Sequence, residues 1–197
     1  MTPLEQTLAA KILRFEDDRA TGPASLRIRK LPAADKGGSW EICGICDGIE
    51  PAVFHRIRAL LEEGKRTEAW EACLGYVWNN TAPVRSWIGG SAHPAIELYL
   101  RDHYFNSDSS NTAKILQRAL NDEGASPPLA IDGIVGTATR ASLCQHLGQG
   151  RERPLLTRLR DRRKAFYRSC KQYPQFGRGW LRRSDEAHSF ALTLLHQ

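Results

Sequence analysis

The sequence predicts a mainly α-helical protein with one short β-ribbon near residues 37–49. Apolar residues recur at spacings of three and four through much of the 197-residue chain, which is typical of helices that pack one face onto a core. Signals for helix starts and ends bound these segments. The paired glycines Gly37 and Gly38 are followed by alternating apolar and polar residues, which indicates a tight turn that leads into a hairpin.

The first helix has the clearest start signal. Thr2 offers an N-cap hydroxyl, Pro3 occupies the first helical position, and Glu5 stands three residues after the cap. We expect this helix to end at Glu16, before the Thr21-Gly22-Pro23-Ala24 break. Its apolar face consists of Leu4, Leu8, Ile12 and Phe15.

Glu16 is the first candidate for chemistry. Its carboxylate leaves the helix beside the buried face, where apolar neighbours raise the pKa of a carboxyl group toward the range that a general acid needs. The simpler interpretation is an exposed charge at a helix end. The ribbon carries Glu41 and Asp47, so the helix end and the ribbon could place two carboxylates on opposite walls of one groove.

Later segments are expected to be helices joined by short loops. The apolar stripe from Trp70 to Trp78 predicts core packing. Residues 79–90 are expected to form a loop between two halves, in which Trp87 is a candidate for stacking on a sugar. The residues from Phe176 to Trp180 are expected to form a glycine-flanked turn. The expected helices are residues 50–64, 67–78, 94–106, 109–120, 137–147, 155–170 and 184–196.

Composition limits the class of protein. Hydrophobic residues make up 41% and charged residues 25% of the chain, as in soluble globular proteins. No run approaches the ~18 apolar residues of a membrane span, and the acidic residues among the first twenty argue against a Sec-type signal peptide. We therefore expect synthesis in the cytoplasm, with any export through a phage holin or a dedicated secretion machine.

Cysteine and histidine patterns give no metal or cofactor site. Cys43 and Cys46 have the spacing of a zinc or redox pair, but no second pair or nearby histidines accompany them, so unpaired thiols are favoured. The chain also lacks a nucleophile elbow, a Walker loop and a His-Glu-x-x-His motif. We expect no cofactor and no metal.

Charge is distributed unevenly along the chain. Residues 151–197 contain 12 basic and 4 acidic residues, for a charge of +8, and residues 1–150 carry 16 − 18 = −2. The basic segment is interpreted as a solvated helix face or as a contact for an anionic polymer, with nucleic acid the weakest alternative.

Two groups of motifs resemble glycoside hydrolase family 108, a family of N-acetylmuramidases. In the first half these are Phe15-Glu16, Asp35-x-Gly37-Gly38 and Gly44-Ile45. The second half resembles the predicted peptidoglycan-binding region of that family. Its motifs are Asp102-x-x-x-Asn106-Ser107, Leu116-Gln117, Asp132-Gly133-x-x-Gly136-x-x-Thr139, Arg163-x-x-Phe166-Tyr167 and Gly179-Trp180-Leu181-x-Arg183.

The resemblance implies a lysozyme-like helical fold with a catalytic segment at residues 1–90 and a peptidoglycan-binding-like segment at residues 91–197, packed into one globular unit. Glu16 would be the catalytic acid, and Glu41 is favoured as its partner, ahead of Asp47 and Asp35. The expected substrate-binding residues are Asp17, Asp18, Asp35, Ser39, Trp40, Trp87 and Asn106. The chain departs from the family pattern at several points: Asp17 and Asp18 replace two glycines, and the segment from Asp35 to Gly44 is one residue longer. Ser39-Trp40-Glu41 also replaces a threonine, and Arg182 stands where the family often has asparagine.

The leading hypothesis is a monomeric hydrolase of the β-1,4 bonds of peptidoglycan, either an endolysin or an antibacterial effector that acts in the periplasm or cell wall. A secretion machine or an immunity protein would be a further partner, and nucleic acid is not expected as one. The alternatives are a chitosanase and a non-catalytic wall-binding module, in which Asp17 and Asp18 mark a lost active site.

Overall fold

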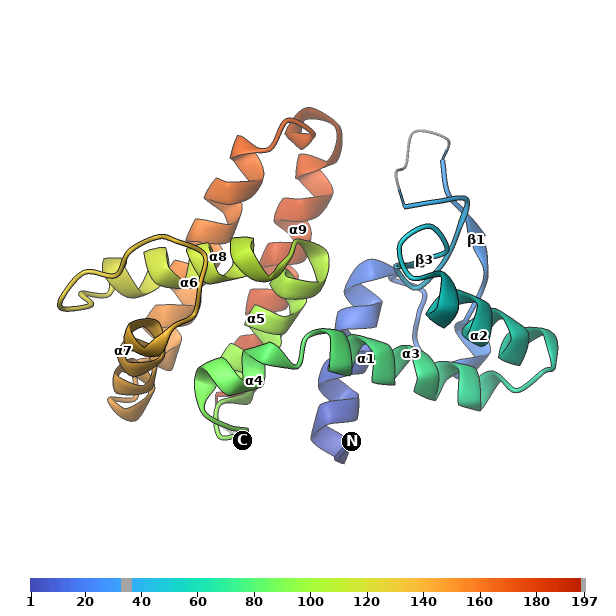
Figure 1. Cartoon of the computed structure of the whole chain (residues 1–197), viewed down its shortest axis with the longest axis horizontal. Helices are drawn as coiled ribbons and strands as arrows, with labels where there is room; N and C mark the ends of the chain where they lie inside the picture. The colour runs from blue at the N-terminus through green and yellow to red at the C-terminus, as the bar shows by residue number, and fades with distance from the viewer. Residues whose placement is uncertain (33–36, 196–197) are drawn as a thin grey trace. The chain divides into compact units, whose positions relative to one another are not determined.

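The computed structural model describes residues 1–32 and 37–195. It is mainly α-helical with a small antiparallel sheet, so the predicted fold class is confirmed (Figure 1). The chain forms two compact units, residues 1–80 (unit 1) and residues 81–197 (unit 2). This division falls before the expected segment boundary at residues 90/91. Within the described ranges, no helix is both long and apolar enough to span a membrane.

Unit 1 is built on α3, against which both α1 and α2 pack. The predicted capping box of α1 is present, since Glu5 N–H donates to Thr2 Oγ1 (3.2 Å) and Thr2 N–H donates to Glu5 Oε2 (2.8 Å). Cys73 and Val77 of the predicted α3 stripe are fully buried. The elements are α1 (Pro3–Glu16), the 3-10 helix η1 (Pro23–Ser25), β1 (Arg29–Lys30), β2 (Trp40–Ile42), β3 (Ile45–Cys46), α2 (Pro51–Glu62) and α3 (Arg66–Asn80).

The predicted ribbon is the β2–β3 hairpin, and β1 adds a third strand beside β2. Ile42 pairs with Ile45, which leaves Cys43 and Gly44 as a two-residue turn. Both turn residues have positive φ (+50° and +81°), as a type I′ hairpin turn requires. The two residues of β1 are both exposed, so no hydrophobic alternation could reveal that strand from the sequence.

Unit 2 surrounds α5, whose residues from Ala95 to His103 are all buried. A helix buried on every side is a central core helix. α8 and α9 pack side by side, and α5 contacts α4, α6, α8 and α9 (Figure 1). The elements are α4 (Pro83–Ile88), α5 (Pro94–Asn106), α6 (Ser109–Asp122), α7 (Thr137–Gly148), α8 (Glu152–Ser169) and α9 (Tyr173–Thr193).

The expected loop at residues 79–90 is wrong, because it contains the helix α4. Proline and glycine, which often mark loops, here bound the helix: Pro83 opens it, and Gly89 closes it with φ +76°. Trp87 is 6% exposed and packs against Tyr104 with ring centroids 5.9 Å apart. The buried ring is a packing residue, which corrects its predicted role of stacking on a sugar. Arg85 also fixes this helix by a double hydrogen bond to Glu97 of α5 (2.9 and 3.0 Å).

The start of α9 differs from prediction. The expected turn from Phe176 to Trp180 lies inside α9, which begins at Tyr173. Gly177 is needed there because a Cβ atom on it would lie 2.4 Å from the Tyr173 ring. At α6, which begins at Ser109 as expected, the N-cap is Asp108, and its carboxylate accepts from the Asn111 N–H at 2.6 Å.

A buried carboxylate joins three helices of unit 2. Asp102 of α5 accepts from Arg163 of α8 (Nη1 to Oδ2, 2.6 Å) and from Arg183 of α9 (Nη2 to Oδ1, 2.7 Å). Burial alone would raise the pKa of Asp102, but the charges of Arg183 and Arg163 outweigh it and lower that pKa. Arg163 also donates to Tyr167 Oη at 2.8 Å, and Tyr167 donates to Asn106 Oδ1 at 2.6 Å. We call these five residues the Asp102 network.

Replacing Asp102 by Asn is expected to lower the free energy of unfolding by about 3–5 kcal/mol, because two arginines with strongly buried side chains lose their counterion. Urea denaturation measures the loss. Asp185→Asn is the matched control: Asp185 pairs with Lys164 on a half-exposed surface, and the expected loss is below about 1 kcal/mol. Equal losses in the two variants would contradict the central role of Asp102.

Candidate functional site

The end of α1 places Glu16 beside the hairpin turn. α1 stops there because Asp17 turns to an extended conformation (φ −131°) while its N–H still donates to the Leu13 carbonyl (2.9 Å). Ile12 and Leu13 in the last turns are fully buried, and the Glu16 side chain is half-buried. The predicted end of this helix is confirmed.

Gly44 gives Glu16 its place against the turn. A Cβ atom on Gly44 would lie 3.0 Å from Glu16 Cγ and 3.3 Å from its carboxyl carbon. The side chain of Glu16 therefore lies directly over the type I′ turn. Gly44 meets two requirements, since its φ of +81° is also a conformation that other residues rarely adopt.

Two further carboxylates lie near Glu16, and both are paired. Asp17 Oδ1 accepts from Arg27 Nη2 at 2.6 Å, and Glu41 accepts from Arg29 Nε at 2.7 Å. Burial would lower the pKa of Arg29, but the hydrogen bond and charge of Glu41 raise it, with contributions from Asp17 and Glu16. These five side chains form what we call the carboxylate cluster (Glu16, Asp17, Arg27, Arg29 and Glu41).

The cluster also surrounds a cysteine. Burial raises the pKa of the Cys43 thiol to about 12, with further increases from the charges of Asp17 and Glu41. Such a thiol stays protonated near neutral pH, which argues against nucleophilic or redox chemistry at this position. All five cysteines of the chain lie in its described part and are reduced thiols.

The predicted partners of Glu16 have structural roles that the sequence did not reveal. Glu41 is 8% exposed and forms a cross-strand ion pair, because β1 and β2 place Arg29 opposite it. Asp47 Oδ1 accepts from the backbone N–H groups of Ser39 (2.8 Å) and Trp40 (3.0 Å). These bonds to the backbone lower the pKa of Asp47 despite some burial and close the turn that precedes β2.

The other predicted binding residues are dispersed. Asp18 and Ser39 are exposed, and Trp40 is 37% exposed on the ribbon. Asp35 lies outside the described residues. Asn106 and Trp87 belong to unit 2, where Asn106 accepts from Tyr167 in the Asp102 network.

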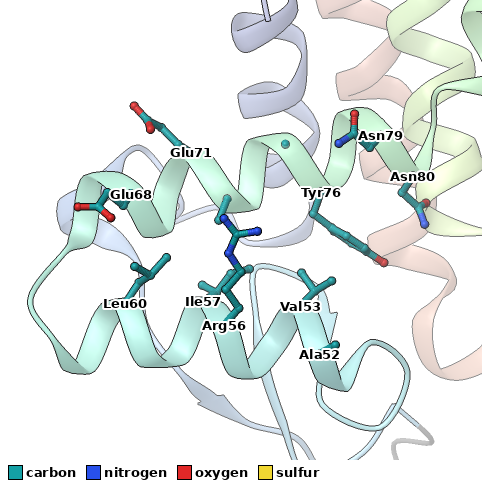
Figure 2. Close-up of a pocket in the computed structure, with 12 residues that line it drawn as sticks. Ala52, Val53, Arg56, Ile57, Leu60, Glu68, Glu71, Tyr76, Asn79 and Asn80 are labelled. Carbon is teal, nitrogen blue, oxygen red and sulfur yellow. The ribbon is translucent and has the colours of Figure 1, made fainter.

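A groove of about 850 Å³ lies between α2 and α3, apart from the predicted site residues. Figure 2 shows Arg56 of α2 and Tyr76 of α3 directed into the space between these helices. Burial raises the pKa of Tyr76 to about 12, and the charge and hydrogen bond of Glu50 add to this. Val53, Ile57 and Leu60 give the groove an apolar wall.

Among the described residues, no group of three or more His, Cys, Asp or Glu side chains has a geometry suited to a metal ion. Arg27 and Arg29 occupy the space beside the carboxylates that a cation would need.

In unit 2, one glutamine organises the Asp132 turn. Gln117 Nε2 donates to Asp132 Oδ1 (2.6 Å) and to the Ile134 carbonyl (3.0 Å), while its Oε1 accepts from the Gly133 N–H (3.1 Å). Gly133 has φ +79°, and a Cβ atom there would lie 2.4 Å from Ser110 Oγ. A pocket of about 430 Å³ opens beside this turn, lined by residues that include Gln117, Asp132 and Ser142.

Gly44→Ala is expected to lower the free energy of unfolding by about 1–3 kcal/mol, the usual cost of a non-glycine residue in a left-handed conformation. Gly75→Ala is the matched control: Gly75 lies inside α3 with no atom within 4 Å of its Cβ position. That change should stabilise the protein by about 0.5–1 kcal/mol. Thermal denaturation of both variants checks the opposite signs, and two equal shifts would contradict the assignment.

The Asp47 turn is expected to loosen in acid. The folded-state pKa of Asp47 lies below its ordinary value of about 3.9, so its stabilising effect is complete above that value and is lost as the pH falls through the folded pKa. The protection factors of the Ser39 and Trp40 amides against hydrogen exchange should fall in acid, because their bonds to Asp47 are lost. Asp47→Asn should abolish this acid-dependent change, and its persistence in the variant would rule out Asp47 as the cause.

Residues 111–185 match the model of a family described as "Predicted Peptidoglycan domain". No curated protein and no solved structure matches the chain. The matched segment contains the Gln117 and Asp132 turn, the second pocket, and Arg163, Tyr167 and Arg183 of the Asp102 network. This part of unit 2 is therefore similar to that family.

Proposed function

We propose that this protein is a cell-wall hydrolase that cleaves β-1,4 glycosidic bonds of peptidoglycan, as in glycoside hydrolase family 108, with Glu16 as the general acid. The single observation that carries the proposal is the position of Glu16. Glu16 is the last residue of α1, and its side chain is half-buried. The side chain lies over the Gly44 turn, near Asp17 and Glu41.

The proposed chemistry needs two carboxyl groups. A protonated carboxyl donates its proton to the glycosidic oxygen as the bond breaks, and a carboxylate either orients the attacking water or attacks the sugar itself. Asp17 and Glu41 are the two carboxylates of the cluster that could take the second role. Each of them forms an ion pair with an arginine, Asp17 with Arg27 and Glu41 with Arg29.

Unit 2 favours peptidoglycan over chitosan as the substrate. The family match covers residues 111–185, and its pocket of about 430 Å³ presents amide, carboxylate and hydroxyl groups to a ligand. In this proposal unit 2 binds the wall and unit 1 cuts it. The enzyme would be made in the cytoplasm and would act on the wall after release or secretion.

The ion pairs also favour a second candidate, a wall-binding module without catalysis. Arg27 and Arg29 engage Asp17 and Glu41 directly. If both carboxylates stay engaged when substrate is present, neither can activate water. The two candidates share wall binding and differ only in bond cleavage.

Glu16→Gln is expected to lower the rate of reducing-end release from purified peptidoglycan about 10²- to 10⁴-fold, the usual contribution of a general acid, while sedimentation with the wall is unchanged. Glu62→Gln is the matched control, because Glu62 is an exposed glutamate that pairs with Arg58 at the end of α2. A parallel assay on chitosan distinguishes the substrates. Wall binding without release of reducing ends by the unaltered protein would favour the binding module.

A further inference from the structure

The turn between α8 and α9 is cationic and aromatic. Residues 162–184 contain eight basic residues, five aromatic residues and no acidic residue. Five of the basic residues are paired with acidic residues: Arg163 and Arg183 with Asp102, Arg162 with Asp122, Lys164 with Asp185, and Arg182 with Glu186. The charge that remains is concentrated around the turn.

Three exposed cations surround that turn. Arg168 lies at the end of α8, Lys171 in the connection, and Arg178 in the second turn of α9. Across the described ranges, no carboxylate forms an ion pair with any of the three. By contrast, an acid at the end of α6 engages arginines near the start of α8: Glu123, the C-cap of α6, pairs with Arg151, the N-cap of α8, and with Arg158.

An aromatic stack holds the exposed ring of Phe176, a residue that lies between Lys171 and Arg178 in the sequence. Tyr167 is buried and stacks on Trp180 (centroids 5.3 Å apart), and Trp180 stacks on Phe176 (5.8 Å). Phe176 is 47% exposed, which makes it one of the large apolar side chains most open to water in the described structure. The stack holds its ring in place at the surface.

We infer that the α8–α9 turn is a docking surface for an anionic phospholipid bilayer. Basic side chains near an anionic leaflet are attracted to its headgroups, and aromatic side chains favour the boundary between headgroups and acyl chains. A hydrated wall polymer or a nucleic acid backbone would attract the same three cations. Neither offers an apolar phase for Phe176, so the exposed ring, which lies between Lys171 and Arg178 in the sequence, favours the bilayer.

This inference does not depend on glycosidic cleavage. It gives the protein a second candidate binding surface. This surface is cationic and apolar, whereas the pocket beside Asp132 is lined by polar groups. A protein that acts on the cell wall would meet such a surface at the membrane that the wall encloses.

Sedimentation of the full-length protein with vesicles tests the proposal. We expect binding to vesicles of phosphatidylcholine that contain one third phosphatidylglycerol, little binding to phosphatidylcholine alone, and release as salt is raised. Lys171→Gln with Arg178→Gln should weaken binding at least about tenfold. Arg56→Gln with Arg118→Gln, which removes two exposed charges elsewhere, should have a much smaller effect.

Phe176→Ser separates lipid from the other anionic partners. The change should weaken vesicle binding several-fold with unchanged circular dichroism, and should leave binding to a DNA duplex or to poly(glycerol phosphate) unaltered. Equal binding of the unaltered protein to neutral and anionic vesicles would overturn the proposal. So would unchanged vesicle binding in either the Lys171→Gln with Arg178→Gln variant or the Phe176→Ser variant. Binding to DNA or poly(glycerol phosphate) in the absence of vesicle binding would overturn it in favour of that polymer.

Discussion

The buried Asp102 carboxylate is the constraint on which unit 2 depends. A charged group inside a protein is tolerated only when it is paired and hydrogen-bonded, and Asp102 meets this condition by drawing one arginine from α8 and one from α9 onto α5. The requirement fixes how three helices approach one another. It also governs the neighbouring His103, since burial and the charges of Arg163 and Arg183 hold its pKa well below the ordinary value. Among the buried side-chain atoms of the described structure, both ring nitrogens of His103 lack a hydrogen-bond partner.

The same network changes the meaning of several motifs. The five residues come from three motifs that resemble the peptidoglycan-binding region and that are far apart in the sequence. Asp102 and Asn106 belong to one, Arg163 and Tyr167 to the second, and Arg183 to the third. In the structure they contact one another. Their spacing is therefore explained by packing, and the residues beside the Asp132 turn are better placed to contact a ligand.

Much of the fold could be predicted because its signals are local. α1 and the hairpin follow from a capping box, a glycine pair and apolar periodicity, all of which act over a few residues. The sequence did not predict α4, a helix of only six residues. It is fixed by an ion pair between its Arg85 and Glu97 of α5, which no local pattern reveals. β1 was missed because strand pairing with β2, not its own pattern, defines it.

The candidate site was only partly predictable for a related reason. The position of Glu16 at the end of a helix is a local property, and the structure has it there. Arg27 and Arg29 carry no sequence signal that pairs them with Asp17 and Glu41, since those pairs depend on where the 3-10 helix and β1 bring the chain. The bonds from Asp47 to two backbone amides likewise become visible only when the turn is formed.

The pairing between α6 and α8 has a consequence for the electric field of unit 2. Asp122 and Glu123, at the end of α6, pair with Arg151, Arg158 and Arg162 in or next to α8. The positive electric field over most of α8 is therefore weaker than the formal charge of residues 151–197 suggests. The unpaired positive charge lies at the turn between α8 and α9, so this end of the two helices is more positive than the other. The electric field of an anionic surface would rotate such a molecule so that its positive end faces the surface before contact. The protein would therefore bind in one orientation.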